Sequence, residues 1–277
     1  MKIGFIGAGK VGFCLGQYFK EKGLSVVGYA SQSPEPAQEA ARLTNSRFFS
    51  DRESLLQAAD LIFLTVPDRF IGQVFASLVG VKGKIFAHCS GSLASDVLAR
   101  ARERGGEAIS LHPLMAISDK YRSRELLAGA FFAIEGDEPA LTQVKNLIAS
   151  LGNEVQILDK TKKTLYHCAA SVVSNFAVAL AFMGSELLDS CGLGGAKPAL
   201  FRLALNNAKN IAEYGPVDAL TGPVERGDVS TVADHLAALS GEDRQLYRLL
   251  ARKLLRVAQL KRVGQDYAPL AQILENP

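Results

Sequence analysis

The chain begins with the stretch Met1-Lys-Ile-Gly-Phe-Ile-Gly-Ala-Gly-Lys-Val-Gly12. Its apolar run, Ile3 to Ile6, predicts a strand, and residues 11–22 predict a helix. A G-x-G-x-x-G between a strand and a helix is typical of a dinucleotide-binding turn, because glycine allows a sharp turn and a close approach of the pyrophosphate. The alternative is a glycine-rich turn that binds nothing. We predict that the cofactor is bound by Gly7, Ala8, Gly9, Lys10, Val11 and Gly12.

The length and charge of the chain limit the classes of protein to which it can belong. Its 277 residues suit one large or two modest domains, since a domain has roughly 100–200 residues. The formal net charge is only +3, and no basic block indicates a nucleic-acid surface. The first strand begins at once, so no signal peptide is expected. We therefore expect a globular protein that does not bind nucleic acid.

The most apolar stretch and the cysteines both favour a cytoplasmic protein. Residues 169–184 form the most apolar stretch, and they are fewer than the roughly 20 residues that span a bilayer. We expect them to form a buried helix and no membrane span. The cysteines have no paired or metal-ligating spacing, and we expect reduced, buried thiols. They are Cys14, Cys89, Cys168 and Cys191.

Strand and helix patterns alternate over the first part of the chain and then give way to helices alone. Beyond residues 3–6, strands are expected at 24–30, 47–49, 60–66, 84–88, 107–111, 131–134 and 154–158. This alternation predicts a doubly wound, mainly parallel sheet. From residue 159 to the end only helices are predicted, the first of them over residues 161–191. The fold class is therefore α/β, with an NAD(P)-binding domain at residues 1–158 and an all-α domain at residues 159–277.

The residues after the second strand favour NADP over NAD. An NAD-binding unit usually has Asp or Glu roughly 20 residues past the glycines, where it bonds the ribose 2′-hydroxyl. Here Ser31, Gln32 and Ser33 occupy that region, and no acid precedes Glu35. Hydroxyl and amide groups accept a 2′-phosphate without charge repulsion, although no arginine is present there to clamp it. NAD remains possible, and these residues could also form only a turn.

Ligands of an open parallel sheet bind beyond the carboxyl ends of its strands. The predicted strands end in Val66-Pro67, in His88-Cys-Ser90 and in His112-Pro113. We expect Val66, Pro67, His88 and Ser90 to line the cofactor, and His112 to lie beside the nicotinamide or the substrate. For each histidine a purely structural role is the alternative.

A polar stripe follows one side of the long predicted helix. Lys163, His167, Ser171 and Asn175 fall within one arc at about 100° per residue. His167 or Lys163 could donate a proton as hydride adds to a carbonyl, because histidine titrates near neutrality. Ser171 and Asn175 could hold the substrate oxygen. The alternative is a set of helix–helix contacts. No metal site is expected, because the histidines lie on separate elements without ligand spacing.

One loop in the helical half carries a further candidate. Residues 215–227 are rich in glycine and proline, and they include Arg226. An arginine can bind a substrate carboxylate through two parallel hydrogen bonds. The alternative pairs Arg226 with Glu225 or Asp228 in a loop that caps the next helix.

Several of these motifs together resemble a known group of proteins. They are the glycine turn, Val66-Pro67-Asp68, His88-Cys-Ser-Gly-Ser92, His112-Pro-Leu114, His167 with Asn175, and Leu220-Thr-Gly-Pro-Val-Glu-Arg-Gly-Asp228. The chain resembles bacterial Rossmann-like proteins with a helical C-terminal domain, a branch related to pyrroline-5-carboxylate reductase, ketopantoate reductase and the β-hydroxyacid dehydrogenases. The resemblance implies NADP-linked reduction of a small carbonyl or imine, and a homodimer built through the helical domain. Proteins of this branch often have an arginine where this chain has Gln32.

The sequence thus predicts an NADP-dependent oxidoreductase that transfers hydride between nicotinamide and a small carbonyl, imine or hydroxy acid. Two alternatives remain open. One is a non-enzymatic NADP-binding sensor or regulator, and the other is an NADP:deazaflavin oxidoreductase. The sequence does not name the substrate.

Overall fold

The computed structural model describes residues 1–121 and 123–275. The chain forms two compact units, Met1–Ser174 and Asn175–Pro277. The sequence places the domain boundary at residue 158, where the strands end. The first unit continues further, because the first turns of the following helix contact it.

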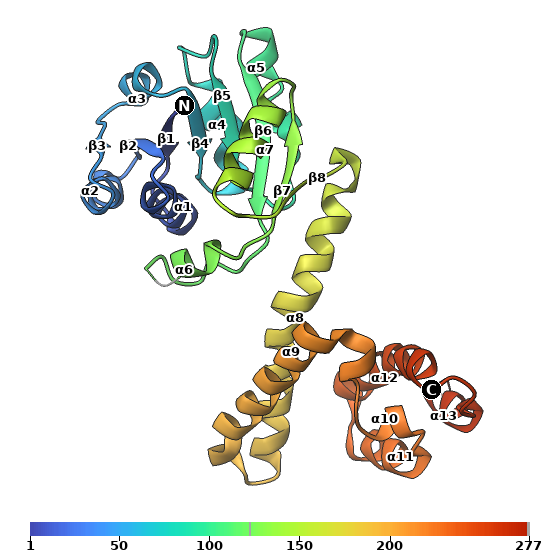
Figure 1. The fold of residues 1–277 in the computed structure, drawn as a ribbon. Coiled ribbons are helices and arrows are strands. Elements are labelled where there is room, and N and C mark those ends of the chain that lie inside the picture. The colour runs from blue at the N-terminus through green and yellow to red at the C-terminus, as the bar shows by residue number, and fades with distance from the viewer. Residues whose placement is uncertain (122, 276–277) are drawn as a thin grey trace. The chain divides into compact units, whose positions relative to one another are not determined.

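An eight-stranded sheet forms the centre of the first unit (Figure 1). The strand order is β3-β2-β1-β4-β5-β6-β7-β8, and every pair is parallel except β6 with β7. This confirms the predicted α/β class with a mainly parallel sheet. The strands are β1 (Lys2–Ile6), β2 (Ser25–Ala30), β3 (Arg47–Phe48), β4 (Leu61–Leu64), β5 (Ile85–His88), β6 (Glu107–Pro113), β7 (Phe132–Gly136) and β8 (Val155–Ile157).

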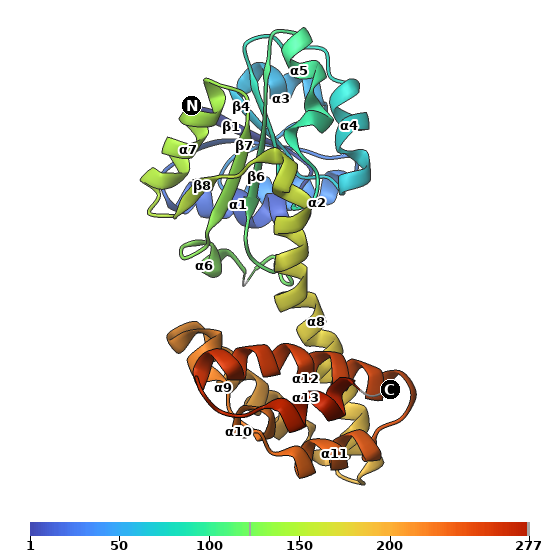
Figure 2. The ribbon, with the colours of Figure 1, turned by 90° about the vertical axis from the view of Figure 1, so that its right-hand side faces the viewer.

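Helices cover both faces of this sheet (Figures 1 and 2). Alternate strand residues feed two separate cores, with Phe5 on one face and Ile6 on the other, as expected where successive side chains point to opposite sides. The first core is covered by α1, α2 and α7, and the second by α3, α4 and η1. The helices are α1 (Lys10–Glu21), α2 (Pro34–Leu43), α3 (Arg52–Ala58), α4 (Asp68–Ala76), η1 (Ser95–Leu98), α5 (Arg100–Glu103), α6 (Ser123–Leu127), α7 (Ala140–Ser150) and η2 (Lys160–Lys162).

The second unit is helical and has a small core of its own. Residues such as Val232, Leu255 and Leu270 form that core, which lies among the last four helices. Gly215 has φ 77° and kinks α9, which then resumes inside the stretch expected to be a loop. The helices, with α8 shared between the units, are α8 (Lys163–Ser190), η3 (Gly194–Ala196), α9 (Lys197–Ala219), α10 (Pro223–Arg226), α11 (Val229–Ala238), α12 (Gly241–Lys261) and α13 (Ala268–Glu275).

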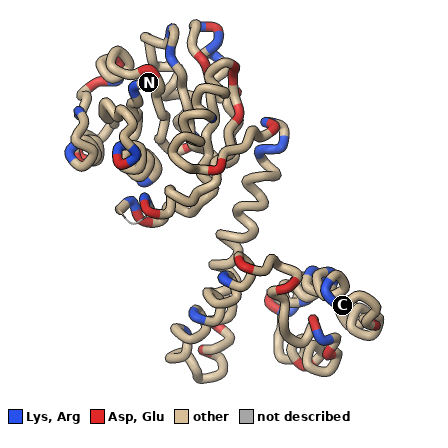
Figure 3. The backbone as a smooth tube through the Cα atoms, in the orientation of Figure 1, with Lys and Arg blue, Asp and Glu red and all other residues tan. Residues whose placement is uncertain are grey.

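The apolar stretch expected to be buried is instead exposed. It lies in α8, where Phe176 is 59% and Phe182 is 65% exposed. Lys163 is the buried residue of α8, and Ala219 is that of α9. No charged residue lies between Lys163 and Glu186 (Figure 3). The apolar sequence of this helix predicted that its side chains would be buried. In the described part of the chain, no other element buries them.

Two further properties of α8 bear on expectations from the sequence. By length and composition alone, the helical segment Lys160–Ser190 could cross a membrane, because the helix extends beyond the stretch that was considered. Cys168 on this helix and Cys191 just after it are exposed, whereas Cys14 is buried and Cys89 is half-buried. The expectation of four buried thiols was therefore wrong for two of them.

Candidate functional site

The glycine turn has the geometry that a pyrophosphate requires. Gly7 has φ +103°, and a Cβ there would lie 2.7 Å from the backbone oxygen of Thr65. A Cβ at Gly12 would lie 2.3 Å from the Thr65 hydroxyl, so α1 packs directly on the end of β4. Gly9 faces open space, because a Cβ at that position would meet no atom within 4 Å. It caps α1 without a side-chain hydrogen bond, so the first amides of the helix are available to an anion.

The other predicted cofactor residues lie along the same edge of the sheet. Ser31, Gln32 and Ser33 connect β2 to α2, and Gln32 and Ser33 are exposed. Val66 is half-buried and Pro67 is exposed, between β4 and α4. Because β1, β2 and β4 are parallel neighbours, their carboxyl ends lie at one edge. The residues expected to contact a dinucleotide are therefore brought together with the glycine turn.

His88 and Ser90 extend this edge beyond β5. The Ser90 hydroxyl donates to Asp68 Oδ2 at 2.6 Å, and it accepts from the Leu93 amide at 3.0 Å. The His88 ring is buried, and its Nε2 contacts the carbonyl oxygen of Ala94 at 3.2 Å. His88 is thus buried beneath the loop that follows β5 and is not exposed at the edge of the sheet. Ser90 and Asp68 shape the loop, and His88 supports it from below.

A histidine–tyrosine–histidine cluster covers the same loop. His112 Nδ1 lies 2.8 Å from the Tyr166 hydroxyl, and the two rings meet edge to face at 88°. The His167 ring centroid lies 6.1 Å from that of His112. A Cβ at Gly91 would lie 2.3 Å from His167 Cδ2 and 2.9 Å from His112 Nε2. Both imidazoles therefore pack on Gly91, and the cluster depends on the absence of a side chain there.

Burial sets the protonation states in this cluster. Burial, and after it the nearby Lys163 ammonium, lower the pKa of His112 to about 4. Burial raises the pKa of Tyr166 to about 12. At neutral pH the imidazole is uncharged and the phenol keeps its proton. Either group can donate in the bond between Tyr166 and His112, depending on the tautomer of the imidazole.

Lys163 lies deeper than its predicted catalytic role requires. Its side chain is 1% exposed, and Nζ donates to the hydroxyl of Ser110 on β6. Burial lowers its pKa, and the carboxylate of Glu135 on β7 opposes this shift. The lysine therefore points into the first unit, where its direct partner is Ser110.

The remaining predicted residues are not gathered into this cluster. Ser171 is half-buried on α8 within the first unit. Asn175 is exposed and is the first residue of the second unit. Arg226 ends α10 in the second unit, where its guanidinium lies 3.9 Å from Asp228 Oδ2. That contact matches the structural alternative for Arg226, and its proposed substrate contact stays a prediction.

Sequence reasoning missed Tyr166 and Asp68. Tyr166 stands three residues after Lys163 and next to His167, and residues three and four apart share a helix face. The polar stripe included His167, four residues after Lys163, but did not include the tyrosine. Asp68 was quoted only as part of a motif. Its position at the start of α4, facing Ser90, becomes visible only from the fold.

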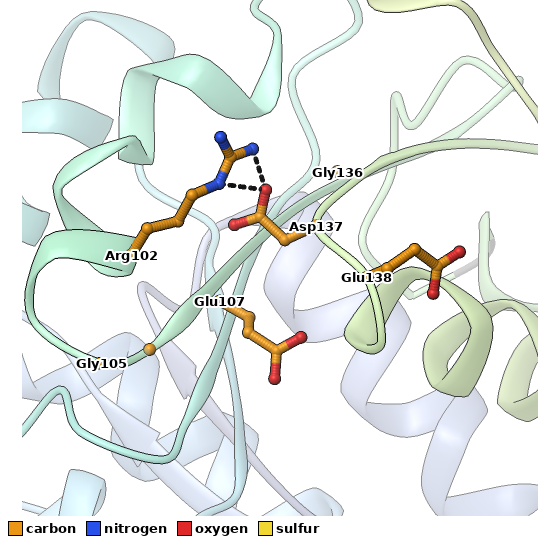
Figure 4. A pocket seen from close by; sticks show the side chains of 7 residues that line it. Arg102, Gly105, Glu107, Gly136, Asp137 and Glu138 are labelled. Carbon is orange, nitrogen blue, oxygen red and sulfur yellow. Dashed lines mark hydrogen bonds and ion pairs between the residues drawn. The ribbon is translucent and has the colours of Figure 1, made fainter.

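A separate hollow of about 550 Å³ lies at the opposite end of β6 (Figure 4). Arg102 forms an ion pair with Asp137 there, and Asp137 also accepts from the Ala108 amide at 2.9 Å. Glu107 accepts from the Ala140 amide at the start of α7, at 2.7 Å. These three carboxylate contacts tie α5 and β6 to the end of β7 and to the start of α7. Glu107 and Asp137 thus have structural partners within the fold.

Comparison with known proteins agrees with this architecture. Residues 1–113 match the model of a Rossmann-like domain, and residues 130–254 match the model of a domain of unknown function, DUF2520. No curated protein matches the sequence. Among solved structures, a Thermotoga maritima protein is 27% identical over 94% of this chain and 99% of its own, with a TM-score of 0.76.

Two further structures extend the comparison. A candidate NADP oxidoreductase from Bacteroides fragilis is 25% identical over 92% of this chain and 98% of its own, with a TM-score of 0.70. The Plasmodium falciparum pyrroline carboxylate reductase, solved with NADP bound, is 15% identical over 94% of this chain and 96% of its own. Its TM-score of 0.58 shows a shared fold. The chain is therefore similar to a Rossmann-like domain over residues 1–113 and to DUF2520 over residues 130–254, and it shares its fold with pyrroline carboxylate reductase.

Proposed function

We propose that this protein is an NADP-dependent oxidoreductase that reduces a small carbonyl or imine. The observation that carries the proposal is the cluster of His112, Tyr166 and His167 on Gly91, at the carboxyl ends of β5 and β6. The glycine turn follows β1 in the same sheet, at the same edge. The turn that would bind a dinucleotide and a group of proton donors therefore share one edge of the sheet in the first unit.

The residues of the turn fit a bound dinucleotide. Open space at Gly9 leaves room for the pyrophosphate, and the N-terminus of α1 supplies amides and a positive dipole end. Ser31, Gln32 and Ser33 would contact the 2′-phosphate without a repelling acid. When bound, the nicotinamide would supply hydride. The bacterial candidate NADP oxidoreductase at 25% identity supports the choice of NADP.

Tyr166 is the best placed proton donor. Addition of hydride to a carbonyl or imine leaves an oxygen or nitrogen that takes up a proton, and a positioned acid speeds that step by roughly 10²–10⁴-fold. The Tyr166 phenol keeps its proton at neutral pH. After the phenol has given that proton to the substrate, His112, which lies within hydrogen-bond distance, could supply another. His167 packs beside His112 and would contact the substrate. We therefore assign proton donation to Tyr166, with His112 as its hydrogen-bond partner; donation by His167 or Lys163 stays a prediction from the sequence.

Turnover of NADPH against a panel of small ketones, aldehydes and cyclic imines tests the proposal. We expect Tyr166→Phe to lower the rate about 100-fold or more and to leave NADPH affinity within about threefold, a change of under 1 kcal/mol. Tyr247→Phe is the matched control, because the Tyr247 hydroxyl also lies 2.8 Å from a histidine, His235. The proposal fails if wild-type protein turns over no member of the panel, or if both variants lose activity equally.

We further propose that a second copy of this chain covers the exposed apolar side chains of α8 and α9. In the second unit these include Phe176, Phe182 and Phe201, and a Cβ at Gly184 would lie 3.2 Å from Leu200, so the two helices touch there. Monomeric proteins rarely leave an apolar patch this long uncovered. The polar residues Ser174 and Asn175 on α8 suit a protein partner better than lipid.

Sedimentation velocity tests this association. We expect a dimer that the double variant Phe176→Asp/Phe182→Asp converts to a monomer, because each phenylalanine contributes about 1.5–3 kcal/mol when buried. Val263→Asp is the control, since Val263 is 90% exposed and lies in the turn after α12, outside α8 and α9. A monomeric wild type, or one that floats with phosphatidylcholine vesicles, would contradict the proposal.

A further inference from the structure

We propose that Lys163 is a positioning residue: a buried cation that holds the neighbouring His88 and His112 in their uncharged forms. Its importance for reduction rests on the function proposed above. This role differs from proton donation to the substrate, which would require the ammonium group to reach the mouth of the site.

The register of the sheet places the lysine among these groups. Ser110 on β6 pairs with His88 on β5 and with Glu135 on β7. Paired residues on adjacent strands point to the same face, and adjacent strands lie about 4.8 Å apart. The side chains of His88, Ser110 and Glu135 thus form a row across three strands. Lys163 Nζ donates to the hydroxyl of Ser110, so the ammonium group lies over the middle of this row. His112 is two residues further along β6, on the same face.

Hydrogen bonds from Ser95 hold Glu135, the member of this row on β7. Glu135 accepts from the Ser95 amide and from the Ser95 hydroxyl, both at 2.7 Å. Its carboxylate therefore has a defined position, and it favours the charged form of Lys163. The ammonium group is thus held between an anion at β7 and the histidines of β5 and β6, where burial leaves little water to screen it.

The effect on the histidines has the expected sign. The pKa of His88 and that of His112 are each lowered to about 4, first by burial and next by Lys163. Asp68 acts in the opposite direction on both. Other charged or titratable groups around them, from every element packed there, are Cys89 after β5, Glu135 on β7, and Tyr166 and His167 on α8.

An uncharged imidazole matters for the chemistry of the cluster. It has one N–H and one free lone pair, whereas an imidazolium has two N–H groups and no acceptor. Only the uncharged form can take a proton on one nitrogen and release one from the other. His112 can then exchange a proton with Tyr166 at physiological pH, and Lys163 protects that capacity.

Histidine NMR titrations of the protein without nucleotide test the inference directly. The chain has only four histidines, so their ring signals can be assigned by single substitutions. We expect Lys163→Met to move the titrations of His88 and His112 to higher pH. Lys163→Arg, which keeps the charge, should leave them near their wild-type positions, and His235 in the second unit serves as an internal reference.

Lys162→Met is the matched control, because it removes the same charge from the exposed neighbouring position. Unchanged His88 and His112 titrations in Lys163→Met, or equal shifts in Lys162→Met, would overturn the inference. If Lys163→Met does not fold, Lys163→Gln gives the same comparison with a side chain that can still bond Ser110. Since no nucleotide or substrate is present, a failure here is distinct from a failure of the proposed reductase function.

Discussion

Two histidine–tyrosine pairs in this protein have nearly the same geometry and different surroundings. His112 and Tyr166 lie 2.8 Å apart with ring centroids at 5.6 Å, and His235 and Tyr247 lie 2.8 Å apart with centroids at 5.7 Å. The first pair lies beside a second histidine at the carboxyl edge of the sheet. The second pair links α11 to α12, and His235 is exposed. The first pair therefore differs from the second in its place at the sheet edge, its burial and its nearby cation, and our proposal rests on these differences.

Substitution of Gly91 should have the largest effect, because it should disturb the pair His112–Tyr166 and leave the pair His235–Tyr247 unchanged. A Cβ there would meet both His112 and His167, so Gly91→Ala should displace the imidazoles and cost about 1–3 kcal/mol of stability. We expect at least a tenfold loss of NADPH-dependent turnover with the pair His235–Tyr247 unchanged in NMR spectra. Gly129→Ala is the control, because a Cβ there meets no atom within 4 Å. Full activity in Gly91→Ala would contradict the assigned role of the cluster.

The second difference is a dependence of stability on pH. The pKa of His112 is about 4 in the folded protein and about 6.5 in an unfolded chain. Between these values the unfolded chain binds a proton that the folded chain does not. The free energy of unfolding should therefore fall as pH drops from 6.5 to 4, by up to about 1.4 kcal/mol per pH unit for each such histidine. His112→Gln should reduce this slope in thermal unfolding of the first unit, and an unchanged slope would show that His112 is not shifted.

The smallest difference is the coupling within each pair. A double-mutant cycle with His112→Ala and Tyr166→Phe should give a coupling of about 1–3 kcal/mol, because contacting groups with little solvent screening interact strongly. The same cycle with His235→Ala and Tyr247→Phe should give under about 1 kcal/mol, since water competes for an exposed bond. Chemical denaturation measures both cycles. Equal couplings would remove burial as the feature that distinguishes the pairs.

The sequence predicted the first unit well because local patterns determine it. Apolar runs bounded by glycine-containing turns predicted the strands. Gly7 and Gly12 have the close backbone and side-chain contacts that the motif implies. His112 and His167 were both named from the sequence, and the fold brings them together. Their contact with Gly91 could not be read from the sequence, because it joins residues on β6, α8 and the loop after β5.

The errors of the sequence analysis have physical causes of their own. The burial of Lys163 was not foreseen, because a helical stripe gives a direction but not a depth and its partner Ser110 lies 53 residues earlier; its role toward a substrate stays a prediction. Phe176 and Phe182 were expected to be buried because hydropathy does not say which surface buries a side chain. Tyr166 was not named, because its contact with His112 joins α8 to β6 and depends on the fold.

Binding of NADPH to the glycine turn is the central claim, and calorimetric titration tests it most directly. Wild-type protein should bind NADPH saturably and more tightly than NADH. Gly9→Ala should keep the fold, because a Cβ there meets no atom within 4 Å, and should still weaken NADPH binding at least tenfold by occupying the space of the pyrophosphate. Gly129→Ala should bind like the wild type. Absence of saturable binding by the wild type, or unchanged affinity in Gly9→Ala, would contradict the account.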